Sequence, residues 1–379
     1  MPSVKQISSL GTWSTFVHTH QMTNGRRKNV KTTTKPRRKK VMREKVPFRP
    51  NPKHIKADTL NSKTATSATR LAKRRGEAPK SVVPSILETS NSDDFALLDS
   101  GYGRKLERYG SVTIVRPEAQ AVWPPALPEQ QWNNADAVFT GDVDEEGAGR
   151  WRKRNTSLND TWHMAIDGVS FLGRFTAFRH VGVFAEQIVH WRDMAQRIQK
   201  CGRPDPVRVL NLFGYTGVAS LYAAAHNAHV THVDASKKAI GWARENQTLA
   251  QLDDKPIRWI CDDAMKFVER EVRRGNTYDI ILLDPPVYGR GPNGEVWQLF
   301  DHLPTMMAAC RDLLSKDALA MTLTAYAIRS SLFSIHEIMM ETMTGFTPAG
   351  TVTSGELVLR DEAANRFLST SMYSRWSNQ

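Results

Sequence analysis

Apolar and polar residues change their spacing along the chain, and the change predicts where strands and helices lie. From residue 207, short apolar runs alternate with stretches whose apolar residues recur every three or four positions, a pattern typical of buried strands between amphipathic helices. The predicted strands are 207–213, 230–233, 257–260, 279–283 and 319–324. The predicted helices are 218–226, 237–250, 264–274 and one within 296–314. Strict alternation of this kind predicts an α/β fold with a doubly wound, Rossmann-like parallel sheet.

The segment before this sheet has a different pattern, in which short apolar pieces are separated by glycine turns. A hairpin is predicted within 95–110, a strand at 112–115, a loop at 144–149 and two strands around Gly173 within 164–179. We therefore predict a small β-rich unit over 93–195, followed by the α/β domain over 196–379.

Positive charge is concentrated before residue 81. Residues 1–80 hold 21 Lys and Arg against three acids, whereas the whole chain has a net charge of +13, so the remainder is mildly acidic. Residues 1–43 hold no acid and many Ser and Thr, a composition typical of a mitochondrial transit peptide. The basic run at 35–40 would instead suit a nuclear signal, and a plain basic arm would bind polyanions by counterion release. Because residues 44–92 are poor in apolar residues, we predict a mostly disordered basic tail over 1–92.

Composition excludes several other classes. No run of about 18 uncharged apolar residues is present, so no transmembrane helix and no membrane partner are predicted. The three cysteines, Cys201, Cys261 and Cys310, lie far apart, which excludes a disulfide framework and suits a reducing compartment. No spacing of His, Cys and acidic residues predicts a metal site.

The residues that follow the predicted strands are the candidates for ligand binding, because these strand ends share one edge of a doubly wound sheet. Glycines follow the first strand in the turn 214–217, and acids follow the next three strands: Asp234, Asp262 with Asp263, and Asp284. The turn lacks the G-x-G-x-x-G of dinucleotide sites and the Gly-Lys-Ser/Thr of P-loops. The acids could accept hydrogen bonds from ribose hydroxyls and from an adenine amino group, but no pyrophosphate site is present. This combination favours S-adenosylmethionine as the ligand. Taken singly, Asp234 or Asp263 could instead cap a helix.

These motifs resemble those of class I S-adenosylmethionine-dependent methyltransferases, and within that fold the bacterial family that includes the large-subunit rRNA methyltransferases. The resemblance spans roughly 94–379. It rests on NLFGYTG at 211–217, VDAS at 233–236, DDA at 262–264, LDPP at 283–286 and FRHVGVFAEQ at 178–187, with further matches at 97–101, 103–107, 115–118 and 289–292. It implies a seven-stranded sheet that ends in an antiparallel pair, 354–360 and 369–375.

The resemblance also implies a role for each site residue. Asp234 would bind the ribose hydroxyls, and Asp263, beside Asp262, the adenine amino group. Asp284 would contact the cofactor and, with the Pro285 carbonyl, face the methyl acceptor, with Tyr288 as the stacking aromatic. The methionine end of the cofactor would lie against Phe184, Glu186, Gln187, Asn211, Phe213, Gly214, Tyr215, Thr216 and Gly217.

Three acceptor atoms can be compared with the sequence. Carbon 5 of cytosine needs a cysteine nucleophile, which is absent from 322–326, and we interpret Cys310 as a core residue. An exocyclic amine would be served by Asp284 and the Pro285 carbonyl, whereas guanine N7 needs only positioning and stacking. The Asp-Pro-Pro-x-aromatic order resembles the N7-guanine members, so we place a purine first, with N7 slightly ahead.

The sequence therefore predicts a mitochondrial methyltransferase that acts on a purine of organellar rRNA, with rRNA or a pre-ribosomal particle as its partner. Val287 stands where the bacterial relatives commonly carry Lys, which leaves open a catalytically silent ribosome-assembly factor. Methylation of a protein or small molecule is a third hypothesis. The β-rich unit either only packs against the next domain or serves as an RNA platform.

Overall fold

A computed structural model describes residues 74–141, 149–326, 328 and 330–378. The predictions made for residues 1–73, which include both targeting signals, and most of the loop predicted at 144–149 lie outside the described residues. The described residues belong to one compact unit, Thr69–Gln379. Across these ranges, no helix is long and apolar enough to span a bilayer, and no three His, Cys, Asp or Glu side chains are grouped as metal ligands.

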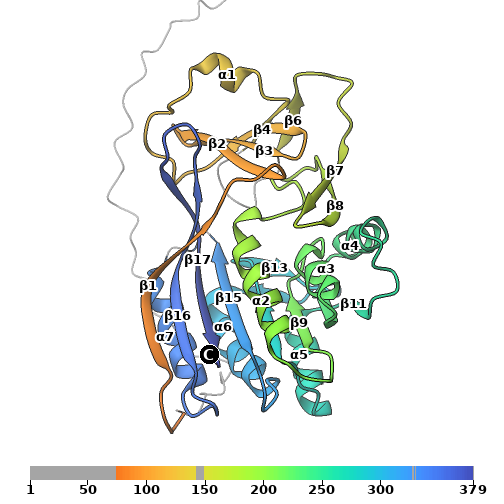
Figure 1. The fold of residues 1–379 in the computed structure, drawn as a ribbon, viewed down its shortest axis with the longest axis vertical. Helices are drawn as coiled ribbons and strands as arrows, with labels where there is room; N and C mark the ends of the chain where they lie inside the picture. Colours follow the sequence, from red (N-terminus) through yellow and green to blue (C-terminus); the bar gives the residue numbers. More distant parts are fainter. Residues whose placement is uncertain (1–73, 142–148, 327, 329, 379) are drawn as a thin grey trace, which may run out of the picture. The chain divides into compact units, whose positions relative to one another are not determined.

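The main sheet is the predicted Rossmann-like sheet with one additional strand (Figure 1). Its order is β1-β16-β17-β15-β12-β9-β10-β11, and every neighbouring pair is parallel except those that β17 makes with β15 and β16. The strands are β1 (Lys80–Thr89), β9 (Arg208–Leu212), β10 (His229–Asp234), β11 (Ile257–Cys261), β12 (Ile280–Leu283), β15 (Ala320–Tyr326), β16 (Thr351–Arg360) and β17 (Phe367–Ser377). The antiparallel pair implied by the resemblance is therefore present as β16 and β17.

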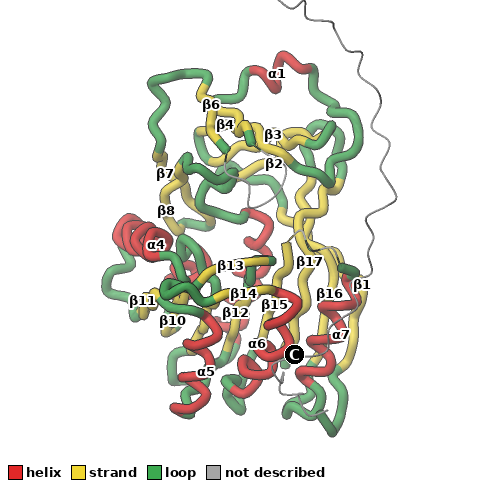
Figure 2. The backbone as a smooth tube through the Cα atoms, turned by 180° about the vertical axis from the view of Figure 1, so that it is seen from behind, coloured by secondary structure: helices red, strands yellow, loops and turns green. Residues whose placement is uncertain are grey.

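Helices cover both faces of this sheet, as Figures 1 and 2 show from opposite sides. One face carries α2 (Ile188–Lys200), α3 (Val218–Ala225) and α4 (Lys237–Leu249); the other carries α5 (Ala264–Arg274), α6 (Leu299–Asp312) and α7 (Leu332–Met343). Successive side chains of a strand point to opposite faces. Ile280 and Leu282 of β12 therefore join the core under α2 and α3, whereas Ile281 and Leu283 join the core under α5, α6 and α7. Two buried faces explain why the strands are continuous apolar runs.

The strand β1 lies where the sequence predicted disorder. It pairs in parallel with β16 from Lys80 opposite Thr351 to Thr89 opposite Leu359. Pro84 does not prevent this pairing, because β1 is an edge strand and its register shifts at the proline, both of which are positions that tolerate proline. Within the predicted disordered tail over 1–92, residues 80–89 therefore form a strand instead.

The β-rich part contains a five-stranded sheet of order β2-β3-β4-β5-β6 and a separate hairpin, β7-β8. The elements are β2 (Phe95–Gly101), β3 (Arg104–Tyr109), β4 (Val112–Pro117), α1 (Glu129–Asn133), β5 (Ala137–Thr140), β6 (Arg150–Lys153), β7 (Thr161–Ile166) and β8 (Val169–Arg174). The β2–β3 hairpin confirms the one predicted within 95–110. The β7–β8 hairpin turns at Asp167 and Gly168, both with positive φ, and not at Gly173 as predicted. Gly173 lies inside β8, where an added Cβ would come within 2.4 Å of the Trp162 ring.

A buried ionic cluster joins β2 to the connection between β16 and β17. The Arg366 guanidinium lies 3.1 Å from a carboxylate oxygen of Asp99 and 3.1 Å from one of Asp361, and both acids are fully buried. Ser100 Oγ donates to Asp361 Oδ2 at 2.8 Å. Because breaking a buried ion pair leaves an uncompensated charge, this cluster holds the β-rich part against the main sheet.

Candidate active site

The turn after β9 has the strained backbone that is common at ligand sites. Phe213, Tyr215 and Gly217 have φ values of 57°, 52° and 81°, in the left-handed region. The two glycines are required by the packing beneath the turn: a Cβ on Gly214 would come within 2.4 Å of the His232 ring, and one on Gly217 within 2.8 Å of Trp259. The sequence explained these glycines only by the close approach of a ligand.

A buried hydrogen-bond chain fixes Asn211 below this turn. Asn211 Nδ2 donates to Ser220 Oγ at 2.9 Å, and Ser220 Oγ lies 3.0 Å from His232 Nδ1. Burial lowers the pKa of His232 to about 3, so the imidazole is neutral at pH 7. Asn211 is therefore held by a neutral network in one orientation.

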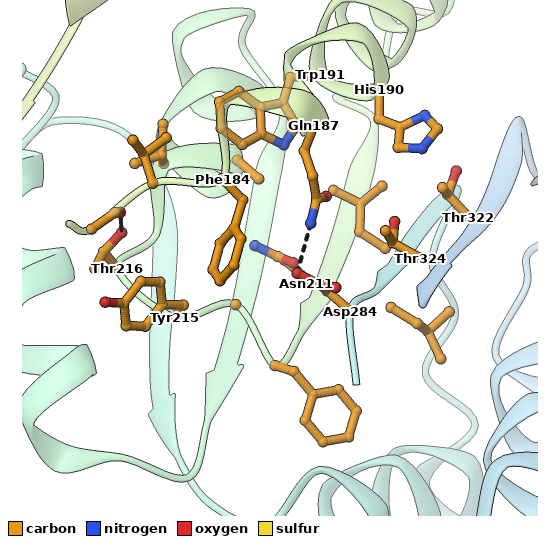
Figure 3. Close-up of a pocket in the computed structure, with 18 residues that line it drawn as sticks. Phe184, Gln187, His190, Trp191, Asn211, Tyr215, Thr216, Asp284, Thr322 and Thr324 are labelled. Carbon is orange, nitrogen blue, oxygen red and sulfur yellow. Dashed lines mark hydrogen bonds between the residues drawn. The ribbon is translucent and has the colours of Figure 1, made fainter. Parts of the chain in front are cut away.

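A cavity of about 50 Å³ lies between this turn, the segment before α2 and the ends of β12 and β15. Gln187 Nε2 donates to Asp284 Oδ2 at 2.6 Å across it (Figure 3). Thr216 Oγ1 donates to the Gly182 carbonyl at 2.5 Å, which ties the turn to the segment before α2. The predicted site residues that line the cavity are Phe184, Gln187, Asn211, Phe213, Gly214, Tyr215, Thr216 and Asp284.

Three of the predicted acids, Asp234, Asp262 and Asp263, lie outside this cavity, at the ends of β10 and β11. Asp234 accepts hydrogen bonds from the Tyr215 and Ser236 amides at 2.9 and 2.7 Å, so both of its oxygens have partners within the protein, and its contact with the ribose hydroxyls stays a prediction. Asp263 caps α5 by accepting from the Lys266 amide at 2.9 Å, which is the alternative role considered for it. Its contact with an adenine amino group stays a prediction.

Two further predicted residues have structural roles in the same region. Asp262 pairs with Arg270 and accepts from the Asp263 amide at 2.8 Å, so both of its oxygens have partners within the protein. Gly217 is the N-cap residue of α3. Cofactor contacts of Asp262 and Gly217 therefore also stay predictions.

The segment after Asp284 forms a hairpin that the sequence did not predict. Pro285 is buried, and β13 (Tyr288–Arg290) pairs with β14 (Val296–Gln298), so the helix predicted within 296–314 begins only at Leu299. Trp297 Nε1 donates to the Pro286 carbonyl at 2.8 Å and fixes the segment. Tyr288 is 38% exposed and lies outside the cavity, with the Arg290 guanidinium carbon 5.8 Å from its ring centroid, so its role as a stacking aromatic stays a prediction.

Sequence reasoning missed two residues of α2 that line the cavity, His190 and Trp191. The spacing of Ile188, Trp191, Ala195 and Ile198 is helical and could have predicted α2. Within the described residues, neither ring nitrogen of His190 nor Trp191 Nε1 has a hydrogen-bond partner. Buried polar atoms are normally paired, so these atoms suit a polar ligand at the inner end of the cavity, such as the amino-acid end of S-adenosylmethionine.

A second cavity, of about 100 Å³, also has Phe184 in its lining. Glu186, predicted to bind the cofactor, lines this second cavity and not the first. The β-rich part contributes Lys105 and Arg116 to its wall, and Tyr326 at the end of β15 contributes another side. Sequence reasoning named none of these three residues as site residues.

Arg116 is held in that wall by Glu107, which is fully buried. The Nε and Nη2 atoms of Arg116 lie 2.5 and 2.9 Å from the two carboxylate oxygens of Glu107. Burial alone would raise the pKa of Glu107, but Arg116, Lys105 and the hydrogen bond from Tyr109 lower it below its usual value. The pair is therefore charged at neutral pH.

We predict that Glu107→Gln lowers the free energy of unfolding by about 3 kcal/mol, because it leaves a buried guanidinium without its counter-charge. Glu129→Gln is the matched control, since it breaks an exposed pair with Arg104 and should cost about 0–1 kcal/mol. Urea unfolding monitored by tryptophan fluorescence measures both values. Equal effects of the two substitutions would contradict the structural importance of Glu107.

Comparisons with known proteins agree with this geometry. A family model described as "Conserved hypothetical protein 95" matches residues 196–319. The crystal structure of a SAM-dependent methyltransferase from Agrobacterium tumefaciens is 59% identical, with 81% of this chain and 98% of that chain covered and a TM-score of 0.78. A candidate SAM-dependent methyltransferase from Streptococcus mutans, 16% identical, shares the fold over 76% of each chain with a TM-score of 0.55.

A relative with a named substrate covers less of the molecule. The ribosomal RNA large subunit methyltransferase K/L of Syntrophotalea carbinolica is 26% identical over 206 residues, which is 54% of this chain and 28% of that protein. This chain thus spans about a quarter of the length of that relative. The near-complete match to the Agrobacterium structure confirms the predicted fold class, family and cofactor. This chain belongs to the S-adenosylmethionine-dependent methyltransferases.

Proposed function

We propose that the protein transfers a methyl group from S-adenosylmethionine to a purine base of ribosomal RNA. The observation that carries this proposal is the 2.6 Å hydrogen bond between Gln187 and Asp284. Asp284 is the first residue of the Asp-Pro-Pro segment, and it lines the same cavity as residues 213–216 of the turn. The similarity to the rRNA methyltransferase of Syntrophotalea carbinolica supports RNA as the substrate class.

In this proposal, the bound cofactor supplies an activated methyl group, and different residues bind the cofactor and orient the acceptor. Asp234, at the carboxyl end of β10, would accept from the ribose hydroxyls in addition to the two backbone amides that it already binds. In this proposal, Asp284 and the Pro285 carbonyl would supply the oxygens that orient the base. Because the transfer is an in-line displacement, holding the acceptor atom at near-attack distance supplies much of the rate enhancement. This arrangement serves guanine N7 and an exocyclic amine alike.

Two measurements test the proposal on the full-length chain. Isothermal titration should show that S-adenosylmethionine binds, and tritium-labelled cofactor should label total bacterial rRNA, with digestion to nucleosides to identify the base. Binding without transfer to any RNA would favour the silent assembly factor, and transfer only to protein would favour the third hypothesis. The mitochondrial location stays a prediction from the composition of residues 1–43.

Cofactor affinity should depend on pH through Asp234. Burial raises the pKa of Asp234 to about 6, although the Ser236 and Tyr215 amides partly offset the effect. The carboxyl group is therefore charged above pH 6 and protonated below it, where it accepts less well from hydroxyl donors. We predict that affinity for S-adenosylmethionine is constant from pH 7 to 8 and falls below pH 6 by up to about tenfold per unit. Titrations at half-unit steps measure it, and a flat profile from pH 5 to 8 would contradict the assignment.

A further inference from the structure

A chain of hydrogen bonds runs from Asp284 to Glu186 through two other side chains. Gln187 Nε2 donates to Asp284 Oδ2 at 2.6 Å (Figure 3) and also lies 3.4 Å from the Tyr326 hydroxyl oxygen. The Tyr326 hydroxyl in turn donates to the Glu186 carboxylate. The chain therefore joins the acid assigned to the methyl acceptor to a buried carboxylate that does not line the first cavity.

The direction of these hydrogen bonds follows from the chemistry of the groups. Burial raises the pKa of Tyr326 well above its usual value, and the charges of Glu186 and Asp284 add to this effect, so the hydroxyl keeps its proton at neutral pH. A hydroxyl has one proton to donate, and a carboxylate can only accept. Because Tyr326 donates its proton to Glu186, it can only accept from Gln187.

This direction selects one orientation of the Gln187 amide. An amide has a donor end and an acceptor end, and a half-turn about its last bond exchanges them. With Tyr326 as an acceptor, the Nε2 end must face both Tyr326 and Asp284, which uses both of its hydrogens. In the turned orientation, Gln187 Oε1 would face the Asp284 carboxylate and repel it. Glu186 and Tyr326 therefore select the orientation in which Asp284 has a donor.

The surrounding fold holds both residues that select this orientation. Thr89, the last residue of β1, is fully buried, and its hydroxyl donates to the Glu186 carbonyl at 3.0 Å. The Tyr326 ring packs against the Phe184 ring, with centroids 5.0 Å apart. The strand β1, which the sequence did not predict, thereby fixes the backbone at the last carboxylate of the hydrogen-bond chain.

We propose that Glu186 and Tyr326 are positioning residues for methyl transfer, which act through Gln187 to hold Asp284 as an oriented hydrogen-bond acceptor. This inference rests on the proposed function, in which Asp284 faces the methyl acceptor. It gives Glu186 a role different from the cofactor contact that the resemblance implies. It also explains why a carboxylate is buried here, because burying a charge is costly unless the charge is hydrogen-bonded.

Removal of the Tyr326 hydroxyl tests the proposal. In Tyr326→Phe, Gln187 loses the acceptor that selects its orientation, so kcat for methyl transfer to rRNA should fall about tenfold, the order expected for one hydrogen bond to a charged group. KM for RNA and the Kd for S-adenosylmethionine should stay within about twofold of wild type. Tyr278→Phe is the matched control. The Tyr278 hydroxyl also donates to a carboxylate, that of Glu271 at 2.8 Å, but Tyr278 precedes β12, at the end opposite Asp284, so kcat should not change.

A double-mutant cycle measures whether Tyr326 acts through Gln187. Gln187→Met keeps the length of the side chain and removes the amide, so adding Tyr326→Phe to it should change kcat by less than about twofold. If the two effects multiply instead, Tyr326 acts independently of Gln187 and the inference is wrong. A Tyr326→Phe variant with wild-type kcat would lead to the same conclusion.

The variant Glu186→Gln distinguishes positioning from cofactor binding. A glutamine can donate to the Tyr326 oxygen, which frees the tyrosine proton for Gln187 Oε1 and permits the turned orientation. We expect kcat to fall about fivefold while cofactor affinity stays unchanged. Weaker binding of S-adenosylmethionine with wild-type kcat would overturn the inference and favour the cofactor contact.

Urea unfolding tests the hydrogen-bond chain without the reaction. The effects of Tyr326→Phe and Gln187→Met on the free energy of unfolding should be less than additive in the double variant, as expected for side chains in one network. Additive effects would overturn the inference whatever the RNA assay gives. A wild-type protein that transfers no methyl group would remove the proposed function, and coupled unfolding effects would then still support the orientation of Gln187.

Discussion

Replacing Asp284 by Asn should lower kcat for methyl transfer to rRNA by about a hundredfold or more, which is the usual effect of losing a positioned carboxylate at a reacting centre. The Kd for S-adenosylmethionine should stay within a few-fold of wild type. Asp284 Oδ2 accepts from Gln187 at 2.6 Å, and an amide in its place presents a donor on one side. The acceptor base would then lose both a charge and its alignment.

The measurement is single-turnover transfer of a tritiated methyl group, with cofactor affinity determined separately by isothermal titration. Asp301→Asn is the matched control, because Asp301 is an exposed acid in the first turn of α6. Should Asp284→Asn transfer methyl groups at the wild-type rate, Asp284 has no role in the reaction. A fall in affinity as large as the fall in kcat would place it on the cofactor alone.

Replacing Asp234 by Ala should weaken cofactor binding by about a hundredfold or more, because it removes hydrogen bonds between ribose hydroxyls and a charged carboxylate, each of which contributes about 1.5–3 kcal/mol. The same carboxylate accepts from the Tyr215 amide at 2.9 Å. Part of the loss could therefore come from a looser turn.

A double-mutant cycle distinguishes these causes. Titration of wild type and Asp234→Ala with S-adenosylhomocysteine and with its 2′-deoxy analogue measures whether the carboxylate and the hydroxyl interact. The wild-type protein should lose affinity for the analogue, whereas the variant should bind both ligands equally weakly. If the variant discriminates between them as strongly as wild type does, Asp234 does not bind the ribose.

Features that depend on the local pattern of apolar and polar residues could be predicted from the sequence. Apolar runs such as that at β12 predicted the buried parallel strands, because residues facing both cores must be apolar. The position of polar residues at strand ends then predicted that the turn after β9 and Asp284 meet at one edge. Cys310, interpreted as a core residue, is fully buried in α6.

Features that depend on distant partners could not be predicted in this way. The strand β1 has an exposed face and a proline, and its stability comes from β16, which lies more than 260 residues later in the chain. The second cavity is formed only when Arg116 and Tyr326 are brought together, and nothing local to either residue indicates the other. The turn of the β7–β8 hairpin is a different case, because Asp167-Gly168 is a strong local turn signal that was overlooked.

The Arg366 cluster has a consequence for how substrates enter. Separating β2 from the connection between β16 and β17 would break the ion pairs of Arg366 and expose Asp99 and Asp361. A hinge motion that moves the five-stranded sheet away from the main sheet is therefore energetically unfavourable. We therefore expect both cavities to be present before a substrate binds. If the protein acts on RNA as proposed, we expect the RNA and not the protein to undergo the larger rearrangement on binding.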